Sequence, residues 1–209
     1  MQSHLHKSIK PHYTIVMTEH KSIEILNSVS GQLLVAMPHI GDNRFFHSVI
    51  LMCQHDGEAA MGLVLNQPIS NLSLDDLTEQ LERPVARFDG EAAIFHGGPV
   101  EGGRGFVVHS TDHMLKDSLP IGDDLAMSFQ LSIIDDIAAG TGPRKHRIML
   151  GYAGWEAGQL EAELREGVWF HLPATKALVF DTQPEELWTR CFHESGIDAA
   201  FLSPQAGSA

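Results

Sequence analysis

Residues that build disulfide frameworks, membrane spans or secretion signals are scarce in this sequence. Of its 209 residues only two, Cys53 and Cys191, are cysteines. Two cysteines are too few for a disulfide framework, and low cysteine usage fits a reducing compartment. The first thirty residues lack the continuous apolar segment of a signal peptide, and no apolar run approaches the length of a membrane span. We therefore expect a soluble, cytoplasmic protein that makes no use of a membrane.

Basic residues are also scarce. The chain holds 14 Lys and Arg residues against 27 Asp and Glu residues, which gives a formal net charge of −13. A body this acidic repels phosphate backbones. Arg144, Lys145 and Arg147 form the only tight basic cluster, and we interpret it as a solvated loop beside a strand. No helix-turn-helix with a basic recognition helix is visible, so direct DNA binding is the weakest functional hypothesis.

Motifs that assemble a catalytic or cofactor site are missing too. The sequence has no Gly-x-Ser-x-Gly elbow. The adjacent glycines of His96–Pro99 are followed by neither a P-loop lysine nor a helix start, so a tight turn with close backbone contact is the favoured interpretation. No second Cys-x-His or His-x-His pair completes the four ligands of a zinc site. We therefore expect no metal and no cofactor, and a non-enzymatic protein is favoured.

Three short apolar runs organise the chain. Leu33–Met37, Val49–Cys53 and Met61–Leu65 are each closed by turn-forming or polar residues, a pattern typical of buried strands. Pro38 ends the first run, because proline donates no backbone N–H. Asp56-Gly57, between the second and third runs, is a strong hairpin signal. The stretch predicts a strand, a loop, a strand, a tight turn and a third strand.

The rest of the chain mixes strands and helices without regular alternation. Further strands are predicted over residues 92–95, 105–109, 125–129, 147–152, 168–172 and 177–180. Helices are predicted over 73–83, 133–139, 157–166 and 182–196, with Ser73, Ser132 and either Asp181 or Thr182 as their caps and Pro184 in the first turn of the last. Residues 110–124 are predicted to form a polar loop. This order indicates an α+β fold.

The chain divides into two unequal parts. Residues 1–30 carry scattered histidines, lysines and serines and little apolar sequence. We predict a partly disordered N-terminal extension there, with a short helix near residues 22–26. Residues 31–209 are predicted to form a single α+β domain.

Two pairs of residues near the first strands are candidate sites. Cys53 and His55 point to the same face of a regular strand, so the thiol could be an activated nucleophile or half of a metal site. The alternative is that Cys53 is a small buried hydrophobe at a strand end. Asp42 and Arg44 lie in the loop after the first strand. They form either a binding pair or an ion pair that fixes the loop.

Two further candidates lie later in the chain. Arg104, among glycines, could bind a carboxylate or phosphate, or could pair with an acidic neighbour inside the fold. Trp155 follows a strand predicted to end at Tyr152 and precedes a helix whose Leu160 packs inward. It is predicted to attach this helix to the sheet, although stacking on a ligand or binding a partner remains open. Glu161 is placed on the exposed side of the helix.

Several motifs in register resemble a known family. The segment LLVAMP with Asp42, then Cys53-x-His55 and Asn66-x-Pro68, is similar to the YqgE/AlgH family of bacterial proteins, and HGGPV, RGFVVH, GYAGW and GQLEAEL follow in the family's order. The match covers about residues 31–203. It implies a single α+β domain with a branched mixed sheet that partly closes into a small β-barrel, flanked by helices. It supplies no catalytic residues, and some members carry a transcriptional-regulator label.

Two positions depart from the family pattern. Gln67 stands where a basic residue usually separates Asn66 from Pro68, and Gly103 stands where an acidic residue commonly precedes Arg104. An anion site that needs the basic group, or an ion pair that needs the acidic one, is therefore in doubt for this chain.

These features favour a regulatory or interaction protein without enzymatic activity, whose partner is a protein rather than nucleic acid. The alternative is a thiol-based sensor or a protein that binds a small molecule or anion. The candidate binding residues for either function are Asp42, Arg44, Cys53, His55, Asn66, Arg104 and Trp155.

Overall fold

The computed structural model describes residues 28–82 and 93–202. The expected extension up to residue 27, with its short helix at 22–26, lies outside the described residues, as do the predicted helix end at residues 83–84 and the final residues 203–209. The boundary between extension and domain at residues 30 and 31 stays a prediction.

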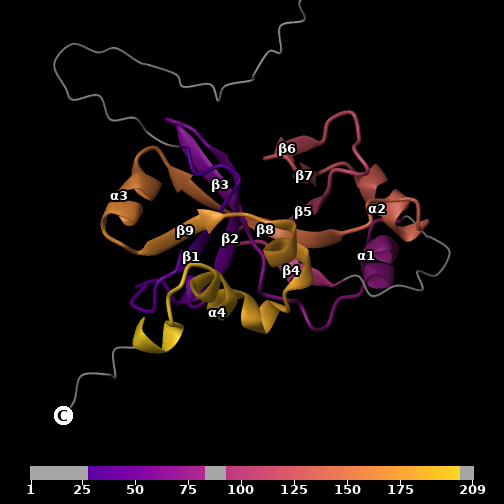
Figure 1. Ribbon diagram of the computed structural model, residues 1–209. Helices are drawn as coiled ribbons and strands as arrows, with labels where there is room; N and C mark the ends of the chain where they lie inside the picture. Colours follow the sequence, from indigo (N-terminus) through magenta and orange to yellow (C-terminus); the bar gives the residue numbers. More distant parts are fainter. Residues whose placement is uncertain (1–27, 83–92, 203–209) are drawn as a thin grey trace, which may run out of the picture.

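Among the described residues, nine strands form one curled sheet (Figure 1). In chain order they are β1 (Gln32–Ala36), β2 (Val49–His55), β3 (Ala59–Val64), β4 (Ile94–His96), β5 (Val100–Ser110), β6 (Leu119–Ile121), β7 (Leu125–Ser128), β8 (His146–Glu156) and β9 (Trp169–Pro173). The spatial order is β6-β7-β5-β8-β3-β2-β1-β9, and β4 pairs with β8 beside this path. All pairs are antiparallel except β4 with β8, so the sheet is mixed, as expected.

Strand β8 is the branch point of the sheet. Its first part pairs with β5 and β4 through residues such as Ile148, whereas its last part pairs with β3, where Ala153 lies opposite Gly62. At the junction a Cβ on Gly97 would lie 2.2 Å from the carbonyl oxygen of Gly151, so only glycine allows this approach. The close backbone contact predicted for His96–Pro99 is confirmed. The curled half-barrel with flanking helices confirms the predicted fold class.

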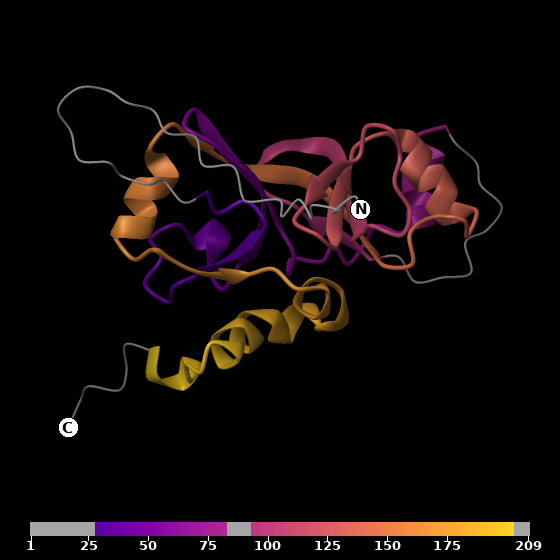
Figure 2. The same cartoon turned by 45° about the horizontal axis from the view of Figure 1, so that its top comes forward.

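In the part of the chain that the structure describes, four α-helices cover the sheet: α1 (Leu74–Gln80), α2 (Leu131–Ala138), α3 (Gln159–Arg165) and α4 (Pro184–Glu194). Shorter helical segments are the 3-10 turns Asn43–Phe45 and Ala199–Leu202 and the π-helical turn Ala177–Asp181. Figures 1 and 2 place α1 and α2 at one end of the molecule and α3 at the other, with α4 along the side of β1 and β9.

Strand alternation divides the core into clusters under different helices. On β1, Leu33 and Val35 join a cluster with Leu187 and Phe192 of α4, while Leu34 joins a second cluster. The second cluster includes Trp155, Trp169 and Leu160 of α3. The third contains Ile133, Ile134 and Ile137 of α2 with Val107 and Ile148. Buried side chains two residues apart therefore share a face, as a period-two pattern requires.

Several local signals are confirmed. Ser73 and Asp76 form a capping box at the start of α1. The Asp56 carboxylate accepts hydrogen bonds from the backbone N–H groups of Glu58 and Ala59, which closes the turn between β2 and β3. Pro184 stands in the first turn of α4, and Gly196 follows the helix with φ 73°.

Other predictions of local structure are wrong. Residues 177–180 form the π-helical turn rather than a strand. The predicted loop 110–124 contains the edge strand β6. The predicted caps Ser132, Asp181 and Thr182 are replaced by Gln130 and Gln183, neither of which makes a side-chain capping bond.

The basic cluster is not simply a solvated loop. Arg147 is buried on β8, where its guanidinium donates to the carbonyl oxygens of Leu65, at 2.5 Å, and Thr182, at 2.9 Å. It also lies over the Phe95 ring. Burial lowers the pKa of Arg147 to about 10. Its neighbours Arg144 and Lys145 pair at the surface with Asp112 and Asp181.

Candidate functional site

The structure does not bring Cys53 and His55 together. A β-bulge lies between Met52 and Gln54, so Cys53 is the extra residue of β2. Cys53 packs against the core cluster under α4. His55 instead contacts Val29 and Glu161, on the side of α3. The bulge shifts the alternation by one residue, and this breaks the shared face on which the predicted pair depended.

The Cys53 thiol lies in an apolar setting. Its Sγ donates to the carbonyl oxygen of Leu51 at 3.6 Å, and burial raises its pKa to about 12. Such a thiol carries almost no thiolate near pH 7. Within residues 28–82 and 93–202, no three His, Cys, Asp or Glu side chains are placed to hold a metal ion together.

His55 connects the start of the described chain to α3. Its Nδ1 accepts a hydrogen bond from the Val29 N–H at 3.1 Å, so Nε2 carries the proton and donates to Glu161 Oε1, also at 3.1 Å. The His55 side chain is 5% exposed and that of Glu161 20% exposed. The prediction that Glu161 lies on an exposed helix face is therefore wrong, because its carboxylate accepts this hydrogen bond from His55.

Trp155 is part of a buried aromatic group. Its indole N–H donates to Glu163 Oε2 at 2.9 Å, and that of Trp169 donates to the same oxygen at 2.7 Å. Gln159 Nε2 donates to Glu163 Oε1. The Trp155 ring is only 6% exposed and meets the Trp169 ring edge to face. It lies on β8, which continues past the predicted end at Tyr152.

Asp42 and Arg44 bind each other. Arg44 Nη2 donates to Asp42 Oδ2 at 2.6 Å, and Arg44 Nε lies 3.0 Å from Asp42 Oδ1. This hydrogen-bonded pairing lowers the pKa of the Asp42 carboxyl. Asp42 also caps the 3-10 turn through the Arg44 N–H. Of the two alternatives, the geometry matches an ion pair that fixes the loop.

Asn66 and Gln67 hold the other end of this loop. Asn66 Oδ1 accepts from the Val49 N–H and its Nδ2 donates to the His47 carbonyl oxygen, both at 2.9 Å. Gln67 Nε2 donates to the carbonyl oxygen of Arg44 and to Ser48 Oγ. His47, held in a left-handed conformation at φ 54°, stacks between the rings of Phe46 and Trp188. Asn66 thus fixes the backbone at His47 and Val49.

Arg104 lies at the surface of β5. Its Nη1 donates to Glu101 Oε2 at 3.0 Å, and both side chains are about half exposed. Its guanidinium carbon lies 5.3 Å from the centre of the Phe106 ring. Of the two alternatives, the geometry matches pairing with an acidic neighbour, and this pair lies at the surface rather than inside the fold.

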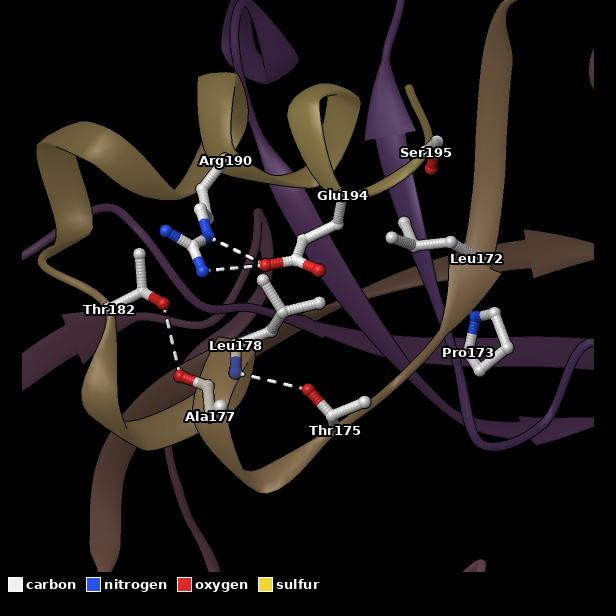
Figure 3. Close-up of a pocket in the computed structure, with 9 residues that line it drawn as sticks. All are labelled: Leu172, Pro173, Thr175, Ala177, Leu178, Thr182, Arg190, Glu194 and Ser195. Carbon is white, nitrogen blue, oxygen red and sulfur yellow. Dashed lines mark hydrogen bonds and ion pairs between the residues drawn. The ribbon is translucent and has the colours of Figure 1, made fainter. Parts of the chain in front are cut away.

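A small hollow lies between α4, the end of β9 and the π-helical turn (Figure 3). It measures about 320 Å³ and is lined by Leu172, Pro173, Thr175, Ala177, Leu178, Thr182, Arg190, Glu194 and Ser195. Its only two charged side chains face each other, since Arg190 Nη2 lies 2.6 Å from Glu194 Oε1. A hollow whose charges are mutually neutralised has little to offer a charged ligand. No pattern in the sequence predicts this hollow, because its walls come from segments with no motif.

Exposed apolar side chains are concentrated in the stretch of chain that contains β6 and β7. Four of the six large hydrophobic side chains that are exposed in the described residues come from the stretch 114–131: Met114, Leu119, Phe129 and Leu131. We call these four residues the β6 edge patch. Leu119 lies opposite Met127 in the β6–β7 ladder, and Phe129 is two residues beyond Met127. Leu119 therefore shares the face of Met127, and Phe129 follows directly after the end of β7.

Comparison with known proteins supports the same architecture. The solution structure of the AlgH protein from Pseudomonas aeruginosa is similar with a TM-score of 0.72 and 42% identity, over 92% of this chain and 100% of that one. A crystal structure of a Corynebacterium diphtheriae protein, 21% identical, matches with a TM-score of 0.67 over 90% of this chain and 94% of that one. At that identity the likeness concerns the fold alone.

Sequence relatives cover nearly the whole chain. A UPF0301 protein of Nitrobacter hamburgensis is 44% identical over 190 residues, 87% of this chain and 88% of that protein. One from Methylobacterium nodulans is 43% identical over 209 residues, 95% of this chain and 97% of its own length. The family model described as AlgH-like matches residues 33–200. The resemblance drawn from the motifs is confirmed, and the chain belongs to the AlgH-like family.

Proposed function

We propose that this protein is a regulatory or interaction protein that binds another protein through the β6 edge patch. The observation that carries the proposal is the concentration of exposed Met114, Leu119, Phe129 and Leu131 in the stretch 114–131, around β6 and β7. Large apolar side chains that cluster at a surface are typical of protein–protein contacts.

The patch favours side-chain docking over strand addition. Strand β6 is an edge strand of three residues, and Pro120 at its centre has no N–H to donate. A partner that adds a strand there would gain few hydrogen bonds. A partner that offers apolar side chains to Leu119 and Phe129 would bury area from both.

The charges around the patch favour a protein partner over nucleic acid. Asp117 and Asp123 are exposed next to β6, where Asp124 is paired with Lys176, and the whole chain carries a net charge of −13. Acidic surroundings attract a basic rim and repel phosphate groups. Regulation by this protein would therefore act through a protein partner.

The alternative of a thiol-based sensor has less support. A sensor thiol needs thiolate near pH 7, and burial opposes the ionisation of Cys53. We also propose a cytoplasmic location, because both cysteines are free. No helix within the described ranges is long and apolar enough to cross a membrane.

Site-specific photo-crosslinking in host cells tests the proposed surface. A photoreactive phenylalanine analogue replaces Phe129 in one variant and Phe46 in a second. Phe46 is the matched control, since it is 53% exposed, against 46% for Phe129, and lies in the distant loop 42–48. We expect a discrete protein adduct only from position 129, which the further change Leu119→Asp removes without lowering Tm by more than a few degrees. Adducts from both positions, or from neither, would overturn the proposal.

A further inference from the structure

A chain of side-chain hydrogen bonds runs inward from the loop before β6. Ser118 Oγ lies 2.7 Å from Ser128 Oγ, and Ser128 Oγ lies 2.9 Å from His109 Nε2. His109 and Ser128 are fully buried, whereas Ser118 is half-buried. Val107 on β5 pairs directly with Ser128 on β7, and His109 follows Val107 by two residues, so both polar side chains point to the same face.

Backbone hydrogen bonds at the two ends of this series determine which side chain donates and which accepts in each bond. His109 Nδ1 lies 3.0 Å from the carbonyl oxygen of Ser110, which can only accept, so Nδ1 carries the proton. Nε2 then carries no proton and accepts a hydrogen bond from the Ser128 hydroxyl. Because that hydroxyl has no second proton, its oxygen accepts the hydrogen bond from Ser118. Ser118 Oγ in turn accepts from the Leu115 N–H at 2.9 Å.

We propose that Ser118 is a nucleophile that accepts the acyl group of an activated ester, with Ser128 relaying its proton to His109. A new bond forms between Ser118 Oγ and the acyl carbon, and the bond from that carbon to the leaving oxygen breaks. The Ser118 proton passes to Ser128 as the Ser128 proton passes to His109 Nε2. The leaving alkoxide takes a proton back from the relay, and water later hydrolyses the acyl group by the same steps.

The surroundings suit this chemistry. Burial lowers the pKa of His109, so its imidazole is neutral near pH 7 and can accept a proton. The loop that carries Ser118 is attached to α2 by His113, whose Nε2 lies 2.8 Å from Asp136 Oδ2. Leu115, whose N–H donates to the hydroxyl, packs against the apolar cluster under α2. An ester of an apolar acid therefore fits better than a charged one.

This site is separate from the proposed partner surface at Leu119. Because neighbouring residues on a strand point to opposite faces, the side chain of Leu119 lies across the β6–β7 layer from that of Ser118. Acyl transfer is an activity beyond partner binding, and neither depends on the other.

An alkyl fluorophosphonate tests the nucleophile in the full-length protein. Its phosphorus accepts the serine oxygen and releases fluoride, while the serine proton enters the relay. We expect one adduct per chain, which peptide mass spectrometry places on Ser118. Ser118→Ala should abolish labelling, and Ser132→Ala, a change at an exposed serine of α2 outside the relay, should not affect it. No adduct, or adducts spread over exposed serines, would overturn the proposal.

The relay is tested by the rate of this labelling. Ser128→Ala should slow it by about 100-fold, the scale of a lost general base. In the parent the rate should rise with pH as His109 loses its proton in the field of His113, His146 and Asp112. In His109→Asn, which keeps a donor for Ser110, the rate should be low at every pH. Unchanged rates in folded Ser128→Ala, or a pH profile shared by parent and His109→Asn, would contradict the relay.

Discussion

At the scale of single residues, one carboxylate organises the aromatic side chains under α3. Glu163 accepts hydrogen bonds from Trp155, Trp169 and Gln159, and no basic side chain is paired with it among the described ion pairs. A carboxylate can accept several hydrogen bonds, and bonds to an ionised acceptor are stronger than neutral ones. Helix α3 is thereby attached to both β8 and β9.

Replacing Trp155 should destabilise the fold. The ring is buried and hydrogen-bonded, so we expect Trp155→Ala to lower the free energy of unfolding by about 3–5 kcal/mol. Trp155→Phe keeps most of the packing and loses the bond to Glu163, so its cost should be about 1–2 kcal/mol. Chemical denaturation of both variants measures this. A Trp155→Ala variant that unfolds like the parent would instead mark the ring as a binding residue.

The two thiols should react slowly. Burial raises the pKa of Cys53 and of Cys191 to about 12, and the thiolate is the reactive form. We expect a disulfide reagent at pH 7.5 to label both residues over hours in the native protein and within seconds to minutes in denaturant. Rapid, stoichiometric labelling of native Cys53 would revive the sensor hypothesis. Cys191, fully buried on α4, serves as the internal comparison.

At the scale of elements, the loop 42–48 depends more on Asn66 than on its ion pair. Asn66→Ala leaves the Val49 N–H and the His47 carbonyl oxygen without partners, which should cost about 1–3 kcal/mol. Asp42→Ala removes a pair whose Arg44 side chain is 66% exposed, so its effect should be far smaller. Comparing urea midpoints of the two variants decides this. Equal losses would show that the ion pair, rather than the amide, fixes the loop.

The elements predicted well are those whose sequence allows one structure. Leu33–Met37 and Val49–Cys53 are closed by clear stops, and Ser73 with Asp76 is specific for a helix start, so strands β1 and β2 and helix α1 follow from local chemistry. The run at 177–180 is short and apolar, which fits a buried strand and a buried helical turn equally. Its π-helical form is set by packing of Leu178 and Val179 under α4.

The candidate site was harder to predict than the fold. The bulge at Cys53 has no signal of its own in the sequence, yet it separates Cys53 from His55. The partners of His55, Val29 and Glu161, are 26 and 106 residues away along the chain. Rules based on residue spacing predict contacts only between residues that are close in the sequence. The relay from Ser118 to His109 likewise joins three segments that only the β5–β7–β6 pairing brings together.

At the scale of the whole molecule, the described domain should not need the residues before it. Residues 1–27 lack apolar periodicity, whereas Val29 is buried and Ser28 Oγ donates to the His55 carbonyl oxygen. Deleting residues 1–27 should therefore leave Tm within a few degrees of the parent. Deletion through Ser30 also removes these contacts and should lower Tm further. Equal Tm losses for both deletions would contradict this boundary.

The pH dependence of stability should be governed by three histidines whose pKa values are lowered in the fold. Desolvation lowers the pKa values of the buried His109, the half-buried His146 and the exposed His47. A group whose pKa is lower in the folded state binds fewer protons there than in the unfolded chain. Its stabilising effect is complete above the unfolded histidine pKa, about 6.5. That effect is lost as the pH falls below this value and through the folded pKa.

We therefore expect Tm to fall as the pH is lowered from 7.5 to 5.5. Most carboxylates stay ionised in this window, because their ordinary pKa values are near 4. Loss of net negative charge at lower pH reduces repulsion within the fold and should raise Tm. The measurement therefore uses salt above about 0.15 M, which screens exposed charges beyond roughly 8 Å. His146→Asn keeps a donor for the Pro143 carbonyl oxygen and should reduce the slope, whereas His39→Gln, at an exposed position, should not. A Tm that stays level or rises toward pH 5.5 would show that the relief of charge repulsion outweighs the cost of protonating these histidines.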